Sequence, residues 1–213
     1  MSILFNTSKI RHLFLAASCL VLGVVLASCS FGSSDDGGSG SGADPGGSVN
    51  STPSSSKGSG VDISSPKNAT GVDVCELLSP EAAKQLGIKP SGERRENDLD
   101  PDVEDSCKYG DSLDGDLSVS LAAFDDRQIV SYYENKEMYA IFEKIGIAGH
   151  PAVVAAKQDP MKSGTCSVFL ASKQDQVVGA VVTVAADDTG KKDPCVPAKK
   201  ALKLSLPSWP AAG

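Results

Sequence analysis

The sequence has no excess of positive charge and very little histidine. Its 20 lysines and arginines are outnumbered by 27 aspartates and glutamates, which gives a formal net charge of −7. Because a nucleic-acid-binding domain needs a basic surface to meet phosphates, this balance argues against nucleic acid as a partner. The two histidines, His12 and His150, supply too few ligands for a zinc site of histidine and cysteine. The composition therefore predicts neither a metal site nor a cofactor.

Several motifs that carry catalysis are also missing. The sequence has no Gly-rich phosphate-binding loop of the Walker type and no Gly-x-Ser-x-Gly motif outside its Ser/Gly-rich stretch. His150 would need a nucleophile and an orienting acid to act as a catalytic base, and we interpret it as a turn residue. These absences favour a protein that is not an enzyme. An envelope hydrolase that uses paired carboxylates on glycans stays open as an alternative.

No apolar run reaches the roughly 20 residues that a membrane-spanning helix needs. The longest one, residues 13–27, is uncharged and follows the basic residues Lys9 and Arg11. A short apolar run behind a basic start is typical of a secretory signal peptide. We therefore predict that residues 1–28 are a signal peptide, with an uncleaved signal anchor as the alternative.

The apolar run ends in Leu26-Ala27-Ser28-Cys29, which resembles the lipobox of bacterial lipoproteins. In such a motif the cysteine thiol takes a diacylglyceryl group, with acyl chains such as palmitate, and the cysteine becomes the new N-terminus. Two acyl chains hold a protein stably at a bilayer, at about 0.8 kcal/mol for each buried CH₂ group. The motif predicts lipidation at Cys29 and a lipid anchor on the extracytoplasmic face of the cell membrane. An ordinary signal peptide with a chance cysteine is the alternative.

Residues 30–60 contain 11 serines and 9 glycines, with Phe31 as the single aromatic residue. Such a composition cannot bury enough apolar surface to offset the entropy lost on ordering the chain. We therefore predict that residues 29–70 are the lipidated cysteine followed by a disordered Ser/Gly-rich tether. The remaining residues, 71–213, are predicted to form a single extracytoplasmic domain.

Four cysteines lie in the predicted domain: Cys75, Cys107, Cys166 and Cys195. An even number of cysteines in an oxidising compartment predicts disulfides, and no Cys-x-x-Cys spacing indicates redox or zinc chemistry. Four cysteines allow three pairings. We favour the sequential one, Cys75 with Cys107 and Cys166 with Cys195, because each bond then closes a loop of about 30 residues, worth roughly 3–4 kcal/mol.

The pattern along the domain predicts an α+β fold with a mostly antiparallel sheet of four to five strands, helices packed on one face and two disulfides. Ser79-Pro80-Glu81 starts one helix, which Gly87 ends, and Asp193-Pro194 starts the last one, reaching about Leu204. A further helix is expected over 127–142. Strands are expected over 107–109, 117–124, 152–156, 165–171 and 177–185, joined by connections that suit hairpins.

The segment Asp73-Val74-Cys75-Glu76-Leu77-Leu78-Ser79-Pro80-Glu81 resembles the opening motif of an actinobacterial lipoprotein family known as domain of unknown function 3558. Tyr109, two residues after the second cysteine, fits an aromatic position of that family. The resemblance covers about residues 73–207 and implies a lipid-anchored, extracytoplasmic domain with two disulfides and no established activity. Further matching segments are Ser106-Cys107-Lys108-Tyr109, Ile147-Ala148-Gly149-His150-Pro151-Ala152, Cys166-Ser167-Val168 and Asp193-Pro194-Cys195.

Two features of the domain are candidate sites. Tyr132, Tyr133 and Tyr139 lie close together in the sequence, and tyrosine combines an apolar ring with a polar tip that suits a ligand surface. They are a candidate binding surface, although we favour a helix–sheet core, which explains the same residues without a ligand. Residues 93–116 are strongly acidic, and we interpret them as a solvated loop. A calcium site starting at Asp98 and a docking surface for a basic partner are the alternatives.

The features together favour a membrane-anchored lipoprotein whose domain binds or senses something in the cell envelope without catalysis. Its expected partners are the membrane, through the lipid anchor, and a small ligand, a lipid or another envelope protein. The alternative is a structural or accessory component of a cell-wall or secretion complex.

Overall fold

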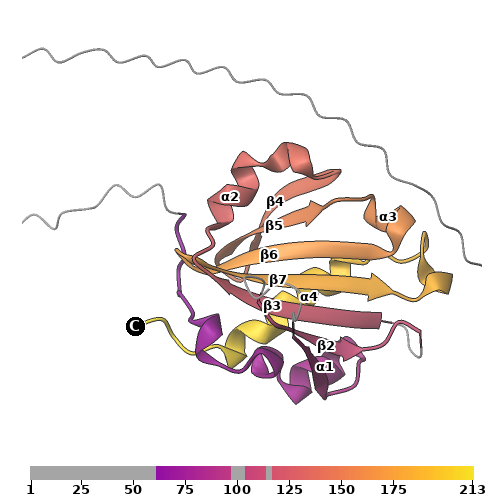
Figure 1. The fold of residues 1–213 in the computed structure, drawn as a ribbon, viewed down its shortest axis with the longest axis horizontal. Helices are drawn as coiled ribbons and strands as arrows, with labels where there is room; N and C mark the ends of the chain where they lie inside the picture. The colour runs from indigo at the N-terminus through magenta and orange to yellow at the C-terminus, as the bar shows by residue number, and fades with distance from the viewer. Residues whose placement is uncertain (1–60, 97–103, 114–116) are drawn as a thin grey trace, which may run out of the picture. The chain divides into compact units, whose positions relative to one another are not determined.

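Seven strands form one antiparallel sheet in the order β1-β2-β3-β7-β6-β5-β4 (Figure 1). This computed structural model describes residues 61–96, 104–113 and 117–213. The prediction of four to five strands is wrong, because the sheet has two further strands, β1 and β4, which form its edges. The strands are β1 (Gly92–Arg95), β2 (Ser106–Gly110), β3 (Leu117–Asp125), β4 (Ile141–Ile147), β5 (His150–Ala156), β6 (Thr165–Lys173) and β7 (Gln176–Val184).

Two helices form where the sequence predicts them. In α1 (Pro80–Leu86), the Ser79 hydroxyl accepts a hydrogen bond from the Ala82 N–H at 3.2 Å, and the helix ends at Gly87. α4 (Cys195–Ser205) begins beside Asp193, whose carboxylate accepts a hydrogen bond from the Cys195 N–H at 2.8 Å. Local capping residues are therefore enough to locate both helices.

The helix predicted over 127–142 is much shorter than expected. α2 covers Ile129–Glu134 and is followed by a 3₁₀ turn, η3 (Lys136–Met138), after which the chain extends into β4. Every residue of β4 pairs with β5 across the tight turn at Ala148 and Gly149. Strand pairing with β5 thus overrides the helical pattern in the second half of this segment.

The remaining helices are short, and none of the helices in the described part of the chain is long and apolar enough to cross a membrane. They are α3 (Pro160–Ser163) and the 3₁₀ turns η1 (Ala69–Gly71), η2 (Val74–Glu76), η4 (Ala186–Asp188) and η5 (Leu206–Ser208).

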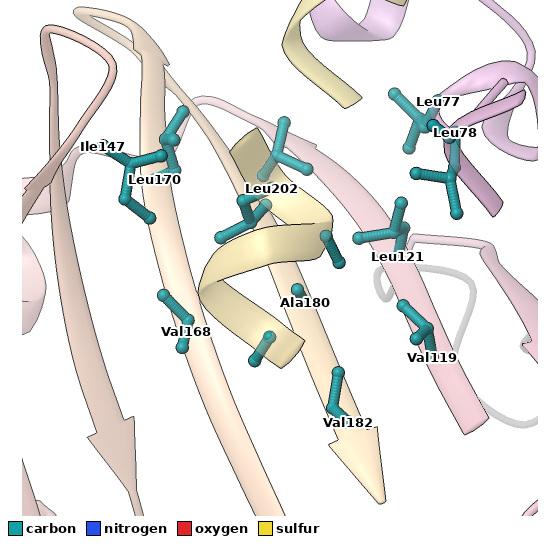
Figure 2. Close-up of a cluster of buried hydrophobic side chains, with 14 of the residues drawn as sticks. Leu77, Leu78, Val119, Leu121, Ile147, Val168, Leu170, Ala180, Val182 and Leu202 are labelled. Carbon is teal, nitrogen blue, oxygen red and sulfur yellow. The ribbon is translucent and has the colours of Figure 1, made fainter. Parts of the chain in front are cut away.

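The larger core lies between the sheet and helices α1 and α4 (Figure 2). Leu202 of α4 points to the sheet between Leu121 of β3 and Leu170 of β6, and all three side chains are fully buried. Trp209 is also buried in this core. The indole N–H of Trp209 donates a hydrogen bond to the Leu77 carbonyl at 3.1 Å. We call this side of the sheet the inner face.

Two disulfides join the core elements, with the sequential pairing. Cys75 bonds to Cys107, which ties η2 to β2, and Cys166 bonds to Cys195, which ties β6 to α4. Next to the first disulfide, the Tyr109 hydroxyl donates a hydrogen bond to the Cys75 carbonyl at 2.9 Å. Burial of this hydroxyl raises the pKa of Tyr109 to about 12.

Helices cover both faces of the sheet, so the prediction of helices on one face is wrong. Along β5, Ala152 and Val154 pack in the inner core, whereas Val153 and Ala155 pack against α2 in a second, smaller core. The side of the sheet that carries α2 is called the open face below. The sequence does not reveal this arrangement because α2 is only six residues long.

Residues 61–70, which the sequence analysis assigned to the tether, pack onto the sheet instead. The side chain of Ile63 is buried with the α2 core. The backbone N–H groups of Lys67 and Asn68 donate hydrogen bonds to the carbonyls of Ser172 and Pro210, at 2.8 and 2.9 Å. The folded part of the chain therefore begins at least ten residues before the predicted boundary at 71.

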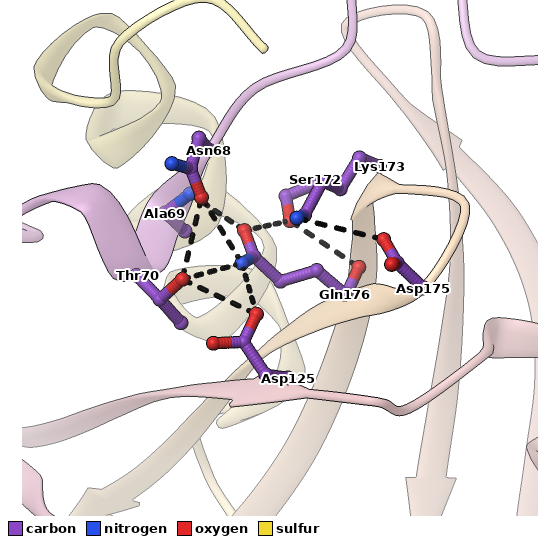
Figure 3. Close-up of polar contacts among 8 residues, drawn as sticks. All are labelled: Asn68, Ala69, Thr70, Asp125, Ser172, Lys173, Asp175 and Gln176. Carbon is purple, nitrogen blue, oxygen red and sulfur yellow. Dashed lines mark hydrogen bonds and ion pairs between the residues drawn. The ribbon is translucent and has the colours of Figure 1, made fainter.

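The buried side chain of Gln176 fixes this segment in place (Figure 3). Its amide oxygen accepts hydrogen bonds from the Ala69 N–H at 2.6 Å and the Ser172 hydroxyl at 2.8 Å. Its amide nitrogen donates to Thr70 and Asp125, at 2.7 and 2.6 Å. The sheet, the helices on its two faces and both disulfides lie within 54–213, which is one compact unit with its own core. This unit therefore has what it needs to fold by itself.

Candidate binding groove on the open sheet face

The open face of the three central strands carries no charge. Strand pairing and alternation assign the residues that β3, β7 and β6 turn to this face, and all of those residues are described. An antiparallel sheet that faces water usually presents polar and charged side chains there. The absence of charge on these central strands is therefore unusual for a solvated surface. The residues are Ser118, Ser120, Ala122, Phe124, Val177, Gly179, Val181, Thr183, Thr165, Ser167, Phe169 and Ala171.

A hollow of about 380 Å³ lies over β3 and β7 on this face. Small side chains and one glycine line its floor, including Ala122, Gly179 and Val181. Val181 is 39% exposed although it lies on a central strand of the sheet. Because exposed apolar surface on a central strand costs free energy in water, the hollow offers favourable burial to an apolar ligand.

Two further hollows follow the first on this face. One, of about 530 Å³, lies over β5 and β6 and shares Phe169 with the first hollow. The other, of about 470 Å³, lies beside α2 and shares Arg127, Tyr132 and Tyr139 with the second. These shared residues link the three hollows in a row, and we call the row the open-face groove.

Gly179 allows two phenylalanine rings to close over the floor of the groove. A Cβ atom at this position would lie 3.0 Å from the ring of Phe169 and 3.1 Å from the ring of Phe124, closer than ordinary contact. The guanidinium group of Arg127 lies over the Phe124 ring, 4.1 Å from its centre, as a cation–π pair. The backbone at Gly179 therefore positions the aromatic wall of the groove.

The three candidate tyrosines belong to one cluster of aromatic rings, but they do not play equal parts. Tyr132 is only 7% exposed and stacks on Phe169 with ring centres 4.4 Å apart, so it is mainly a core residue that supports the wall. Tyr139 is partly exposed and lines two of the hollows. Tyr133 packs against Phe142 and carries Lys144 over its ring at 4.0 Å; neither Tyr133 nor Lys144 is a lining residue.

Burial affects the ionisation of these tyrosines. It raises the pKa of Tyr132, although the neighbouring Arg127 acts in the opposite direction, and it also raises the pKa of Tyr133. Both hydroxyls therefore stay neutral at physiological pH. The aromatic cluster presents uncharged rings to the groove.

Charged side chains gather at the β1 and β2 end of the groove. Arg95 lines the groove there, and its guanidinium pairs with Glu93 at 2.9 Å. Glu96 and Glu104 line the same end, and neither has an ion-pair partner among the described residues. The Oε2 atom of Glu104 is buried and accepts no hydrogen bond. A buried acceptor without a donor is rare and costly, so Glu104 marks a position where a ligand donor would gain free energy.

The other predicted sites do not converge on the groove. His150 is the first residue of β5, is buried, and has its Nδ1 atom 2.8 Å from the Ala171 carbonyl. Within 61–96, 104–113 and 117–213, no group of three or more His, Cys, Asp or Glu side chains is placed to hold a metal ion. The calcium alternative at Asp98 and the lipidation site Cys29 lie outside the described residues.

Sequence reasoning missed the floor of the groove, although one signal was present. β7 reads Gln-Val-Val-Gly-Ala-Val-Val-Thr-Val, an almost continuous apolar run. Such a run is typical of a strand that is buried on both faces. Here one face of β7 is covered by α4 and the other is partly open at Val181. The apolar run of β7 was therefore the one local feature that pointed to this floor.

The fold and the groove define a disulfide-linked domain with a seven-stranded antiparallel sheet and an aromatic-walled depression over the uncharged open face of β3, β7 and β6. The family described as protein of unknown function (DUF3558) matches residues 24–208, and the chain belongs to this family. That description assigns no activity. No curated protein matches the sequence.

Proposed function

We propose that this protein is a lipoprotein, anchored through Cys29 on the extracytoplasmic face of the cell membrane, whose domain binds a ligand in the open-face groove. Two observations support the anchor. The motif that ends at Cys29 has the small residues that a lipoprotein signal peptidase requires. The family match begins at residue 24 and therefore includes this motif.

The uncharged open face of β3, β7 and β6 carries the proposal for binding. A face built for water alone would not leave Val181 exposed beside Ala122 and Gly179 on central strands. The groove offers apolar area, aromatic rings and small hydroxyl side chains, which together suit recognition of a ligand with a large apolar part. Sites of this composition bind ligands through contact area and a few oriented polar groups.

A pair of matched substitutions tests binding in the groove. The full chain is produced in a bacterium that exports it, purified, and analysed by native mass spectrometry and by extraction of bound molecules. We expect a non-covalent mass on the unchanged protein and its loss from Val181→Lys, because a charge on the floor repels an apolar ligand. Val196→Lys is the control, since Val196 is 62% exposed on α4 and lies away from the groove.

The same preparations test the anchor. The N-terminal peptide of the mature protein should carry a diacylglyceryl group on Cys29, and Cys29→Ser should release the protein from the membrane fraction. A protein that carries no bound mass and also fails to bind added apolar probes would contradict the binding proposal. It would favour the accessory-component alternative instead.

A further inference from the structure

The open-face groove contains one buried polar atom that no described group satisfies, and this atom restricts the chemistry of the ligand. The Oε2 atom of Glu104 is buried at the β1 and β2 end of the groove without a hydrogen-bond donor. A carboxylate oxygen can only accept, so the missing partner must bring an N–H or O–H group. A ligand headed by a carboxylate or a phosphate would instead be repelled.

The charges around Glu104 do not supply that partner. Arg95 is paired with Glu93 at 2.9 Å, and Arg127 lies over the ring of Phe124. Glu96, which lines the same end, adds a second carboxylate without an ion-pair partner in the part of the chain that the structure describes. Although Ser106 and Ser120 also line this hollow, no described group donates a hydrogen bond to the Oε2 atom of Glu104.

The rest of the groove is suited to a hydrocarbon chain. Beyond Glu104, Ser106 and Ser120, the lining continues over Ala122, Gly179 and Val181 to Phe169, and the side chains of this part of the hollow are apolar. Sugar-binding sites need several planar polar side chains beside their aromatic rings, whereas the floor here offers small apolar groups. Each buried CH₂ group adds about 0.8 kcal/mol, which corresponds to roughly a fourfold gain in affinity.

We propose that the groove binds a hydrocarbon chain that ends in a primary ammonium or hydroxyl group, with the chain on the Val181 floor and the head group donating to Glu104. This inference rests on the proposed function and adds the chemical class of the ligand. Glu104 acts as the specificity determinant, and the floor supplies most of the affinity.

The test uses residues 54–213 and isothermal titration calorimetry with decylamine below its micelle concentration. Decyltrimethylammonium has the same charge and chain but no N–H group, and butylamine has the N–H groups but a short chain. We expect decylamine to bind about tenfold or more tighter than decyltrimethylammonium, because a hydrogen bond to a charged group is worth that factor. Decylamine has six more CH₂ groups than butylamine, so at about fourfold for each buried group we expect it to bind on the order of several thousandfold tighter.

Glu104→Leu should bring decylamine down to the affinity of decyltrimethylammonium without loss of stability, because it removes an unsatisfied buried oxygen. If Glu104→Leu lowers the stability of the domain while decylamine still binds tighter than decyltrimethylammonium, Glu104 is a structural residue and the inference is overturned. Equal binding of the two decyl probes would also overturn it, while leaving the apolar groove intact. Failure of every decyl probe to bind, or binding that Val181→Lys leaves unchanged, would contradict the proposed function itself.

Discussion

Gln176 connects four parts of the described chain through a single buried side chain. It lies at the start of β7 and bonds to the N-terminal segment, to the end of β3 and to β6 (Figure 3). Glutamine suits this position because its amide can accept and donate at the same time. In the sequence, Gln176 is simply a polar residue close to a turn, and nothing local indicates its role. That role depends on partners that are far away in the chain.

Replacing Gln176 by methionine should lower the free energy of unfolding by about 2–4 kcal/mol, because the Ala69 N–H and the Ser172 hydroxyl lose a buried acceptor while the side-chain volume stays similar. Urea unfolding of residues 54–213 measures the change. Gln128→Met is the control at an exposed position without a side-chain hydrogen bond, and its effect should stay within about 0.5 kcal/mol. Equal stability of the two variants would show that the network is dispensable.

At the scale of elements, the strands that the sequence revealed are the five in the middle of the sheet. β3, β6 and β7 each pair with a strand on both sides. Alternation or an apolar run identifies them in the sequence. The two missed strands are the edges. β1 reads Gly-Glu-Arg-Arg, and such charged edge strands protect a sheet against pairing with other chains. Each edge strand pairs with only one neighbour, and this pairing leaves little signal in the sequence.

The same limit applies to the candidate site. The aromatic residues near α2 were identifiable because they cluster in sequence, and Tyr139 does line the groove. Glu104 comes from a segment separate from Gly179 and Val181 of β7, and the two segments meet only through the order of strands. The apolar run of β7 is the one local signal, so the groove itself could not be derived before the topology was known.

The pairing of the short edge strand β1 can be tested by substituting its glycine. Gly92 lies over the first disulfide, and a Cβ atom there would overlap the Cys107 sulfur and come within 2.7 Å of the Tyr109 ring. Gly92→Ala should therefore detach β1 or displace the disulfide, and lower the free energy of unfolding by about 1–3 kcal/mol. Amide hydrogen exchange of β1 and urea unfolding measure this. Ser91→Ala, at the exposed preceding residue, should leave both unchanged.

For the molecule as a whole, the position at which the chain joins the sheet matters for the proposed anchor. The sequence placed the start of the domain at 71, because 61–70 contain few large apolar residues. In the structure this segment contributes Ile63 to one core and Ala69 to the other, and its backbone pairs with both the β6 end and the C-terminal residues. A pull on the proposed tether would therefore be transmitted to the sheet through 61–70.

Removing this segment should weaken the whole fold. A chain of residues 71–213 loses the burial of Ile63 and Ala69 and leaves Gln176 without its Ala69 partner, so its free energy of unfolding should be at least about 2 kcal/mol below that of 54–213. Urea unfolding of the two chains measures the difference. In the control, Asp62→Ala with Ser65→Ala changes only exposed positions of the segment and should leave stability unaltered. Equal stability of the two chains would mean that the segment merely rests on the sheet, and the boundary at 71 would then hold energetically.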